Sequence, residues 1–134
     1  MSSPSRKTVL FAEDDQMVGN LYSLVLENAG FNVELVEDGN VLVERFQRIE
    51  PDAVLVDLML PGLHGVDAIR AIRALPGGTN VPIIAVTSSF VPEFIKGTKA
   101  AGANTILSKM DLNPTVLIHT LNLFLLSKPP SLAA

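Results

Sequence analysis

Several apolar runs in this sequence are each followed by a side chain that can take part in ionic or hydrogen-bonding chemistry. These side chains are Glu13, Asp14 and Asp15 after the first run, Asp57 after another, Thr87 after a third and Lys109 after a fourth. Crowded carboxylates repel one another unless a cation lies among them, and oxygen ligands favour a hard ion such as Mg²⁺. A carboxylate can also act as a nucleophile and form an acyl phosphate. A lysine ammonium suits a phosphoryl oxygen, so the group types together fit phosphoryl transfer, which relies on positioning and charge neutralisation.

Asp57 stands in the most informative stretch. The residues before it, 53–56, form a continuous apolar run with β-branched members, which is typical of a strand buried on both faces. A Pro61-Gly62 turn follows a few residues later. The carboxyl end of such a strand is where open α/β sheets place their ligand site. Alternatively Asp57 only caps a strand end, because Asp is common in turns.

The elements that must position these groups alternate between strands and helices. Strands are expected at residues 8–12, 31–36, 53–56, 82–86 and 105–107, and helices at 16–29, from 38 or 39 to 49, 65–75, 92–101 and 114–126. In the first helix the apolar period is carried by Met17, Leu21 and Val25, among others. Gly30 and Pro114 are boundary residues of the expected kinds. The pattern predicts an α/β fold, a (βα)₅ parallel sheet with helices on both faces, whose strands all end at one edge.

The composition narrows the class of protein. A chain of 134 residues with 48% apolar residues suits one domain with its own core. The absence of cysteine excludes disulfides, thiolate catalysis and cysteine-ligated metals. A net charge of −4 gives no electrostatic reason to expect direct nucleic-acid binding. Neither a signal peptide nor an apolar run near the ~18 residues of a membrane span is present, so we expect a cytoplasmic protein with no membrane contact.

The loop Asp57-x-x-x-Pro61-x-x-x-Gly65, the acidic pair, Thr87 and the segment Ala101-Gly102-Ala103 to Lys109 together resemble the receiver domain of two-component response regulators. The resemblance covers about residues 7–126 and implies a flavodoxin-like sheet with strand order 2-1-3-4-5. Outside it, residues 1–6 are expected to be a flexible N-terminus, and residues 127–134, with two prolines, a flexible tail or the start of a linker.

The resemblance also implies a role for each group. Asp57 would be the phosphoacceptor, Asp14 a direct Mg²⁺ ligand and Glu13 a ligand through water. The backbone carbonyl of Met59 would be a further metal ligand, Thr87 the switch hydroxyl and Lys109 the cation that pairs with the phosphoryl group. Asp15 falls beyond the acidic pair and is expected to start the helix, where a negative charge is favourable.

The function implied is a phosphorylation switch rather than an enzyme. It would accept a phosphoryl group on Asp57 from the phosphohistidine of a histidine kinase or a histidine phosphotransfer protein, and signal by binding a downstream protein. One alternative is a pseudo-receiver, an interaction module without phosphoryl chemistry. An aspartyl phosphatase would need a second acid where Met59 stands, and a flavodoxin-type flavin binder would need a phosphate-binding loop after Ala12.

Three positions depart from the family pattern, and the mildest is Ser88, which follows Thr87 where the family more commonly has alanine. Met110 follows Lys109 where the family usually has proline, and because a cis bond before another residue costs ~3 kcal/mol, a trans bond is expected. Ile106 replaces a common aromatic residue, so any signal must pass through Thr87 and the helix after it. Apart from these departures, the resemblance implies that Met59 and Ser89 flank the access route of a hydrolytic water. Neither offers an acid or amide to orient that water, which predicts a long-lived phosphoryl group.

A few further residues are assigned a location only. His64 is expected at the surface, and Phe90 and Phe94 in the core. The last helix is more apolar than one buried face requires, which makes Ile118 and Leu125 candidates for a contact surface with a second copy or another partner.

Overall fold

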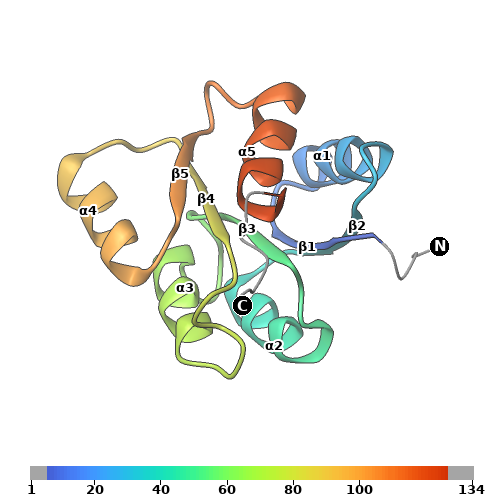
Figure 1. The fold of residues 1–134 in the computed structure, drawn as a ribbon. Coiled ribbons are helices and arrows are strands. Elements are labelled where there is room, and N and C mark those ends of the chain that lie inside the picture. The colour runs from blue at the N-terminus through green and yellow to red at the C-terminus, as the bar shows by residue number, and fades with distance from the viewer. Residues whose placement is uncertain (1–5, 127–134) are drawn as a thin grey trace.

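A computed structural model describes residues 6–126 of the chain as a five-stranded sheet with five helices (Figure 1). The strands are β1 (Thr8–Ala12), β2 (Asn32–Val36), β3 (Ala53–Asp57), β4 (Ile83–Thr87) and β5 (Thr105–Ser108). The helices are α1 (Gln16–Asn28), α2 (Gly39–Ile49), α3 (Gly65–Arg73), α4 (Pro92–Ala101) and α5 (Pro114–Leu126). All neighbouring strands are parallel, in the order β2-β1-β3-β4-β5. The predicted fold class and strand order are confirmed.

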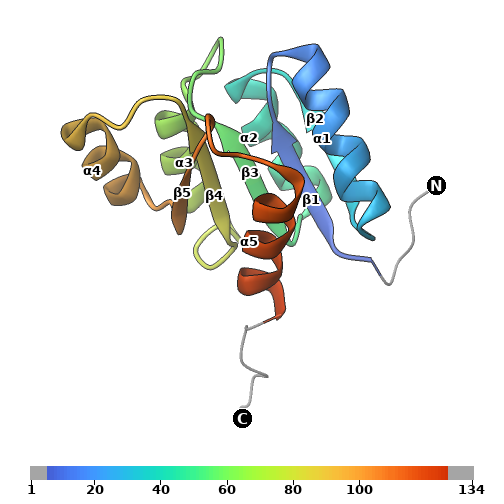
Figure 2. The same ribbon diagram turned by 90° about the horizontal axis from the view of Figure 1, so that it is seen from above.

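The sheet is covered on both faces, with α1 and α5 on one side and α2, α3 and α4 on the other (Figures 1 and 2). Side chains alternate between the faces of a strand. On β1, Val9 therefore packs in the cluster with Leu26 of α1 and Leu117 of α5, while Leu10 packs in the cluster with Leu42 of α2. The near-continuous apolar strands are thus explained by burial on both sides.

Helix α1 begins and ends where the sequence predicts, but its core-facing side is different. The Asp15 carboxylate accepts a hydrogen bond from the Val18 amide at 3.1 Å and caps the helix. Met17 and Leu21 were expected on the buried stripe, and this prediction is wrong, because they are 80% and 55% exposed. Leu26 is the apolar α1 residue that is fully buried. Helix α1 has apolar residues on both sides, so its period alone cannot identify the face that packs.

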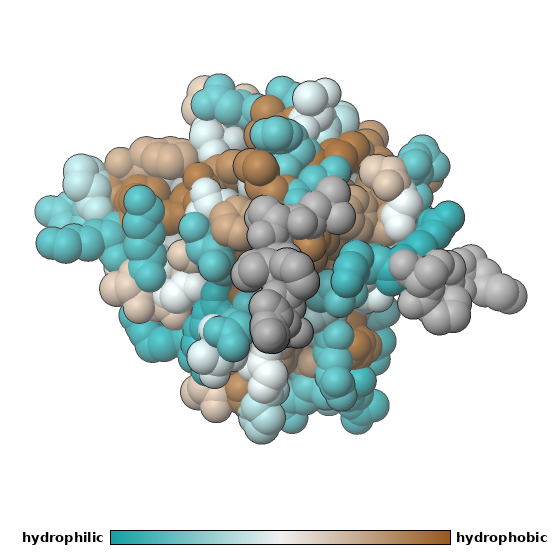
Figure 3. Space-filling view, viewed as in Figure 1, coloured by the Kyte–Doolittle hydropathy of each residue, from teal (hydrophilic) through white to brown (hydrophobic). Residues whose placement is uncertain are grey.

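Two predictions about aromatic and apolar surface residues also need correction. Phe90, expected in the core, is 50% exposed in the loop before α4, whereas Phe94 does pack against the core as expected. Ile118 and Leu125, expected on a contact surface, pack against the core instead. Among the α5 residues whose burial is described, the exposed large hydrophobic residue is Leu123, at 52%. Figure 3 shows hydrophobic surface over α1 and α5, while hydrophilic residues dominate the lower half over α2 and α3.

The chain ends lie outside these elements. The segments predicted to be flexible, residues 1–6 and 127–134, fall outside the described residues apart from Arg6. Within residues 6–126, no helix is long and apolar enough to cross a lipid bilayer.

Candidate functional site

The parallel register brings the predicted site residues to one edge of the sheet. Ala12 pairs with Val56, and Val86 pairs with Asp57. Because every strand runs in the same direction, the residues that follow β1, β3, β4 and β5 all emerge at this edge. The structure therefore brings together six groups that the sequence singled out, which are Glu13, Asp14, Asp57, Met59, Thr87 and Lys109.

Three carboxylates at this edge form a cluster that suits a hard cation. Glu13, Asp14 and Asp57 each place an oxygen within 4.8 Å of the other two. Glu13 and Asp57 are buried, whereas Asp14 is exposed, so the cluster is shielded from solvent on one side and open to it on the other. Burial raises the pKa of Glu13 above its ordinary value, and the nearby charge of Asp57 adds to the effect. Close, like-charged oxygen ligands of this kind fit Mg²⁺.

Lys109 partly neutralises this cluster. Its Nζ lies 2.5 Å from Asp57 Oδ2 and 3.5 Å from Glu13. Burial by itself would lower the pKa of Lys109, but the hydrogen bond and charge of Asp57 outweigh it, so the pKa lies above its ordinary value. The ammonium is therefore present as a cation at neutral pH and offsets charges that would be costly to bury alone.

The same local hydrogen bond holds three of the site residues. The side-chain oxygens of Glu13, Asp57 and Thr87 each accept the backbone N–H two residues ahead, at 3.1, 2.9 and 3.0 Å. For Asp57 and Thr87 this pattern is the Asx- or ST-type turn, in which a side chain replaces a backbone acceptor, and Glu13 makes the equivalent contact with its longer side chain. The backbone donors, at Asp15, Met59 and Ser89, were missed at the sequence level, although the preference of Asp and Thr for such turns is a usable signal.

Asp57 is held in one orientation by these contacts. Its Oδ1 accepts the Met59 amide, while Oδ2 faces Lys109. The loop after it is closed by a hydrogen bond from the Gly65 amide to the Leu58 carbonyl at 3.1 Å. A Cβ on Gly65 would lie 2.5 Å from Leu58 Cα and 3.0 Å from the Asp57 carbonyl oxygen, so only glycine fits there. Gly65, the last residue of the loop that runs from Asp57 through Pro61, thus allows α3 to begin in direct contact with the site.

Thr87 is fully buried, and its hydroxyl faces the loop that leads to α4. The hydroxyl accepts the Ser89 amide and donates to the Ser89 carbonyl at 3.4 Å. Phe90 and Val91, which follow in that loop, are exposed, and α4 begins after Val91 without a side-chain cap. The Thr87 hydroxyl is therefore hydrogen-bonded to the segment that leads to α4.

The loop after Lys109 agrees with the prediction for its backbone. Among the described residues every peptide bond is trans, including the one before Met110. Met110 is 85% exposed, and Ile106 is partly buried. His64 lies at the surface, as expected, and precedes the first residue of α3.

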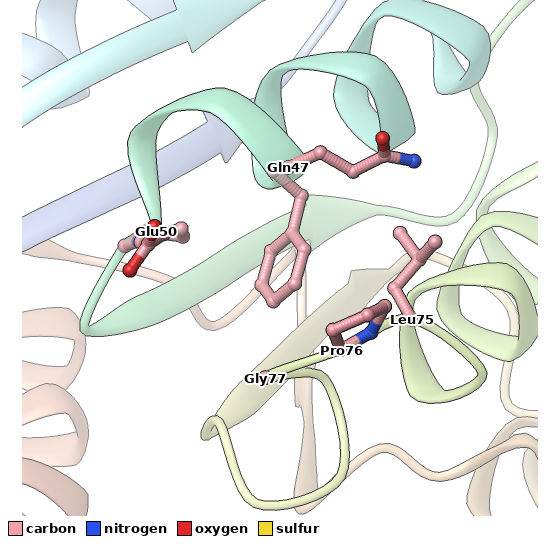
Figure 4. A pocket seen from close by; sticks show the side chains of 7 residues that line it. Gln47, Glu50, Leu75, Pro76 and Gly77 are labelled. Atoms are coloured by element: carbon pink, nitrogen blue, oxygen red, sulfur yellow. The ribbon is translucent and has the colours of Figure 1, made fainter.

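A shallow hollow of about 570 Å³ lies away from this site. Figure 4 shows Gln47 and Glu50 of the α2 end on one side of it, and Leu75, Pro76 and Gly77 on the other. These residues come just before β3 and β4, so they lie at the amino edge of the sheet, opposite Asp57. The hollow takes no part in the chemistry of the acidic cluster.

Comparison with known proteins gives consistent results. The family model described as the response regulator receiver domain matches residues 9–122. The DNA-binding response regulator MtrA of Mycolicibacterium smegmatis is 36% identical over 83 residues, which cover 62% of this chain and 35% of that protein. The matched segment therefore spans about a third of that relative, and the DNA binding in its name belongs to the whole of it.

Solved structures resemble almost the whole chain. The receiver domain of the sensor histidine kinase PA1611 from Pseudomonas aeruginosa, with a magnesium ion in its active-site cleft, is 32% identical with a TM-score of 0.83, covering 90% of this chain and 98% of that one. The chemotaxis response regulator CheY4 of Vibrio cholerae is 29% identical with a TM-score of 0.84, covering 90% of this chain and 100% of that one.

Proposed function

This chain belongs to the family of response regulator receiver domains, and on that basis we propose that it is a phosphorylation switch of two-component signalling whose phosphoacceptor is Asp57. The observation that carries the proposal is the burial of that carboxylate together with its contacts. It is buried, oriented by the Met59 amide, paired with Lys109 at 2.5 Å and set beside two further acids. A strand end needs no such set of contacts for stability alone.

The proposed donor is the phosphohistidine of a histidine kinase or a histidine phosphotransfer protein in the cytoplasm. A carboxylate oxygen of Asp57 attacks the phosphorus, the P–N bond breaks, and the electron pair of that bond stays on the imidazole nitrogen. Lys109, already against Oδ2, neutralises charge on the oxygens of the transferred group. The proposed cofactor is Mg²⁺, which would be held by Glu13, Asp14, Asp57 and the Met59 carbonyl and would supply further charge neutralisation.

The signal would leave the site through Thr87. Turning its hydroxyl toward a phosphoryl group on Asp57 breaks the two hydrogen bonds with Ser89. The loop carrying Phe90 and Val91 is then free to move together with the uncapped start of α4. We expect a downstream protein to recognise that change, while direct nucleic-acid contact is not part of the proposal. If the chain forms a homodimer through α5, Leu123 is the exposed large hydrophobic residue available for that contact.

Hydrolysis of the phosphoryl group should be slow. Met59 is 60% exposed beside Asp57 and carries no group that could orient or deprotonate a water. The same fact disfavours an aspartyl phosphatase, which needs an acid there. The complete set of site contacts disfavours a pseudo-receiver.

The test is intact-protein mass after incubation with acetyl phosphate, with Mg²⁺ or with EDTA. The wild type should gain one phosphoryl group in a Mg²⁺-dependent manner, and Asp57→Asn should gain none. Asp111→Asn is the matched control, because Asp111 is an exposed acid near the same edge of the sheet, and it should behave as the wild type. A folded wild type that gains no phosphoryl group would refute the proposed function.

A further inference from the structure

The segment between Lys109 and α5 makes few packing contacts, although Lys109, to which it is joined, must stay in place. Met110 is 85% exposed, and Asp111 and Asn113 are also exposed. Leu112 is the residue of this segment that packs against the core cluster beneath α1 and α5. Yet the Lys109 ammonium lies 2.5 Å from Asp57, and a shift of this segment would move the lysine with it.

Hydrogen bonds hold the two ends of the segment. The Lys109 amide donates to the Thr87 carbonyl at 2.9 Å, and the Asp111 amide donates to the Ser108 carbonyl at 3.2 Å. At the other end, the Asn113 side chain accepts the Val116 amide at 2.9 Å and caps α5. The middle of the segment depends on another contact.

That contact comes from Tyr22 of α1. Its hydroxyl donates to the Leu112 carbonyl at 3.2 Å, across 90 residues of sequence. The side chains of Tyr22 and Leu112 also pack against the same core cluster. Figures 1 and 2 both show α1 beside α5 and the loop that precedes it.

Helix α1 is itself anchored to the acidic side of the site. Asp15 caps the helix with its side chain and donates its amide to the Glu13 carboxylate at 3.1 Å. Tyr22 lies seven positions further along the helix, so its side chain connects the helix that follows the acids to the segment that follows Lys109.

We infer that Tyr22 is a positioning residue for phosphoryl transfer, whose hydroxyl holds the segment after Lys109 so that the ammonium stays against Asp57. This inference rests on the proposed function. The phenol ring has its own packing role, so the hydroxyl is the group to remove.

The experiment compares phosphorylation rates of the wild type, Tyr22→Phe and Ser23→Ala, measured as mass gain at saturating acetyl phosphate. Tyr22→Phe keeps the ring and removes only the donor. Ser23→Ala removes a neighbouring hydroxyl that has no hydrogen-bond partner in the described chain. We expect Tyr22→Phe to react about two- to tenfold more slowly, from the usual net strength of one hydrogen bond, and Ser23→Ala to react as the wild type. The Mg²⁺ dissociation constant should be unchanged in both, because the acids remain in place.

Repeating the comparison in a Lys109→Met background distinguishes a role of Tyr22 in positioning Lys109 from a general role in protein stability. If Tyr22 acts through Lys109, Tyr22→Phe should cause no further loss there, since coupled residues are not additive. An equal loss in that background, or a normal rate for Tyr22→Phe alone, would overturn the inference while leaving the proposed function intact. A wild type that gains no phosphoryl group would instead refute the proposed function, and the role of Tyr22 with it.

Discussion

Replacing Gly65 by alanine should destabilise the protein, although alanine is normally the better helix residue. Gly65 is the first residue of α3, where an added methyl group would lie 2.5 Å from Leu58 Cα and 2.9 Å from its Cδ2. Ordinary contacts of a Cβ are 3.4 Å or longer, so the neighbour must move by about 1 Å, and the nearest atom belongs to the backbone. Overpacking of this kind costs about 1–3 kcal/mol.

Gly97→Ala is the matched control for this prediction. Gly97 also lies in a helix, α4, but a Cβ there would have no atom within 4 Å. The substitution should therefore stabilise the protein by about 0.5–1 kcal/mol, the usual difference between the two residues in a helix. The two variants, chemically identical, should change the free energy of unfolding in opposite directions.

The assay is urea unfolding of the two variants and the wild type. Their free energies of unfolding are compared with the same dependence on urea concentration for all three proteins. The phosphorylation rate should report the same displacement, because Leu58 lies between Asp57 and the Met59 amide that orients it. A misplacement of about 1 Å can slow a reaction up to a hundredfold. If Gly65→Ala is as stable as the wild type, or is phosphorylated as fast, the claim that the close contact between Gly65 and Leu58 leaves no room for a methyl group is refuted.

Three further predictions test separate parts of the structure. Because burial raises the folded pKa of Glu13, the folded state holds a proton more tightly than the unfolded state, so stability is lost as pH rises from the ordinary value of 4.5 through the raised one. Glu13→Gln should remove this loss, so the metal-free variant should be more stable than the wild type in thermal unfolding at pH 7. The variant should also bind Mg²⁺ more weakly in a titration. If the two proteins show the same dependence of stability on pH, the prediction is contradicted. Arg73→Met should cost about 2–4 kcal/mol in urea unfolding, because the guanidinium donates to four backbone carbonyls and to Asn104. The exposed Arg70, whose partner is three residues away on the same helix, should cost under about 1 kcal/mol when changed to Met, and a similar loss in both would refute the role of Arg73. Met59→Asn should shorten the half-life of the phosphoryl group, followed by loss of the mass adduct after the donor is removed, and an unchanged half-life would count against slow hydrolysis at this site.

Local sequence was sufficient to predict the elements and the site edge. Strand β3 and the position of Asp57 at its carboxyl end were predicted correctly, because an apolar run, a carboxylate and a turn follow one another in the sequence. Parallel pairing then places every strand end at one edge, so the convergence of Glu13, Thr87 and Lys109 with Asp57 follows from topology rather than from any single motif.

What sequence could not supply depends on packing between distant segments. The stripe of Met17 and Leu21 has the right period for a core face, but α1 is apolar on both sides and packs on the sheet through the side of Leu26. Similarly, nothing local distinguishes Leu123 from the buried leucines of α5. The contact of Tyr22 with Leu112 joins residues 90 positions apart, and no periodicity encodes it.

The most direct measurement of the proposed switch is the identity of the phosphorylated residue. Borohydride reduces an acyl phosphate but not a free carboxylate, so a phosphorylated aspartate becomes homoserine and can be located by peptide mass spectrometry. After treatment with acetyl phosphate and Mg²⁺, we predict homoserine at position 57 alone, and none when Mg²⁺ is removed. Homoserine at Asp14 or Asp15 instead, or at no position in a protein that has gained a phosphoryl group, would contradict the assignment of Asp57 as the phosphoacceptor.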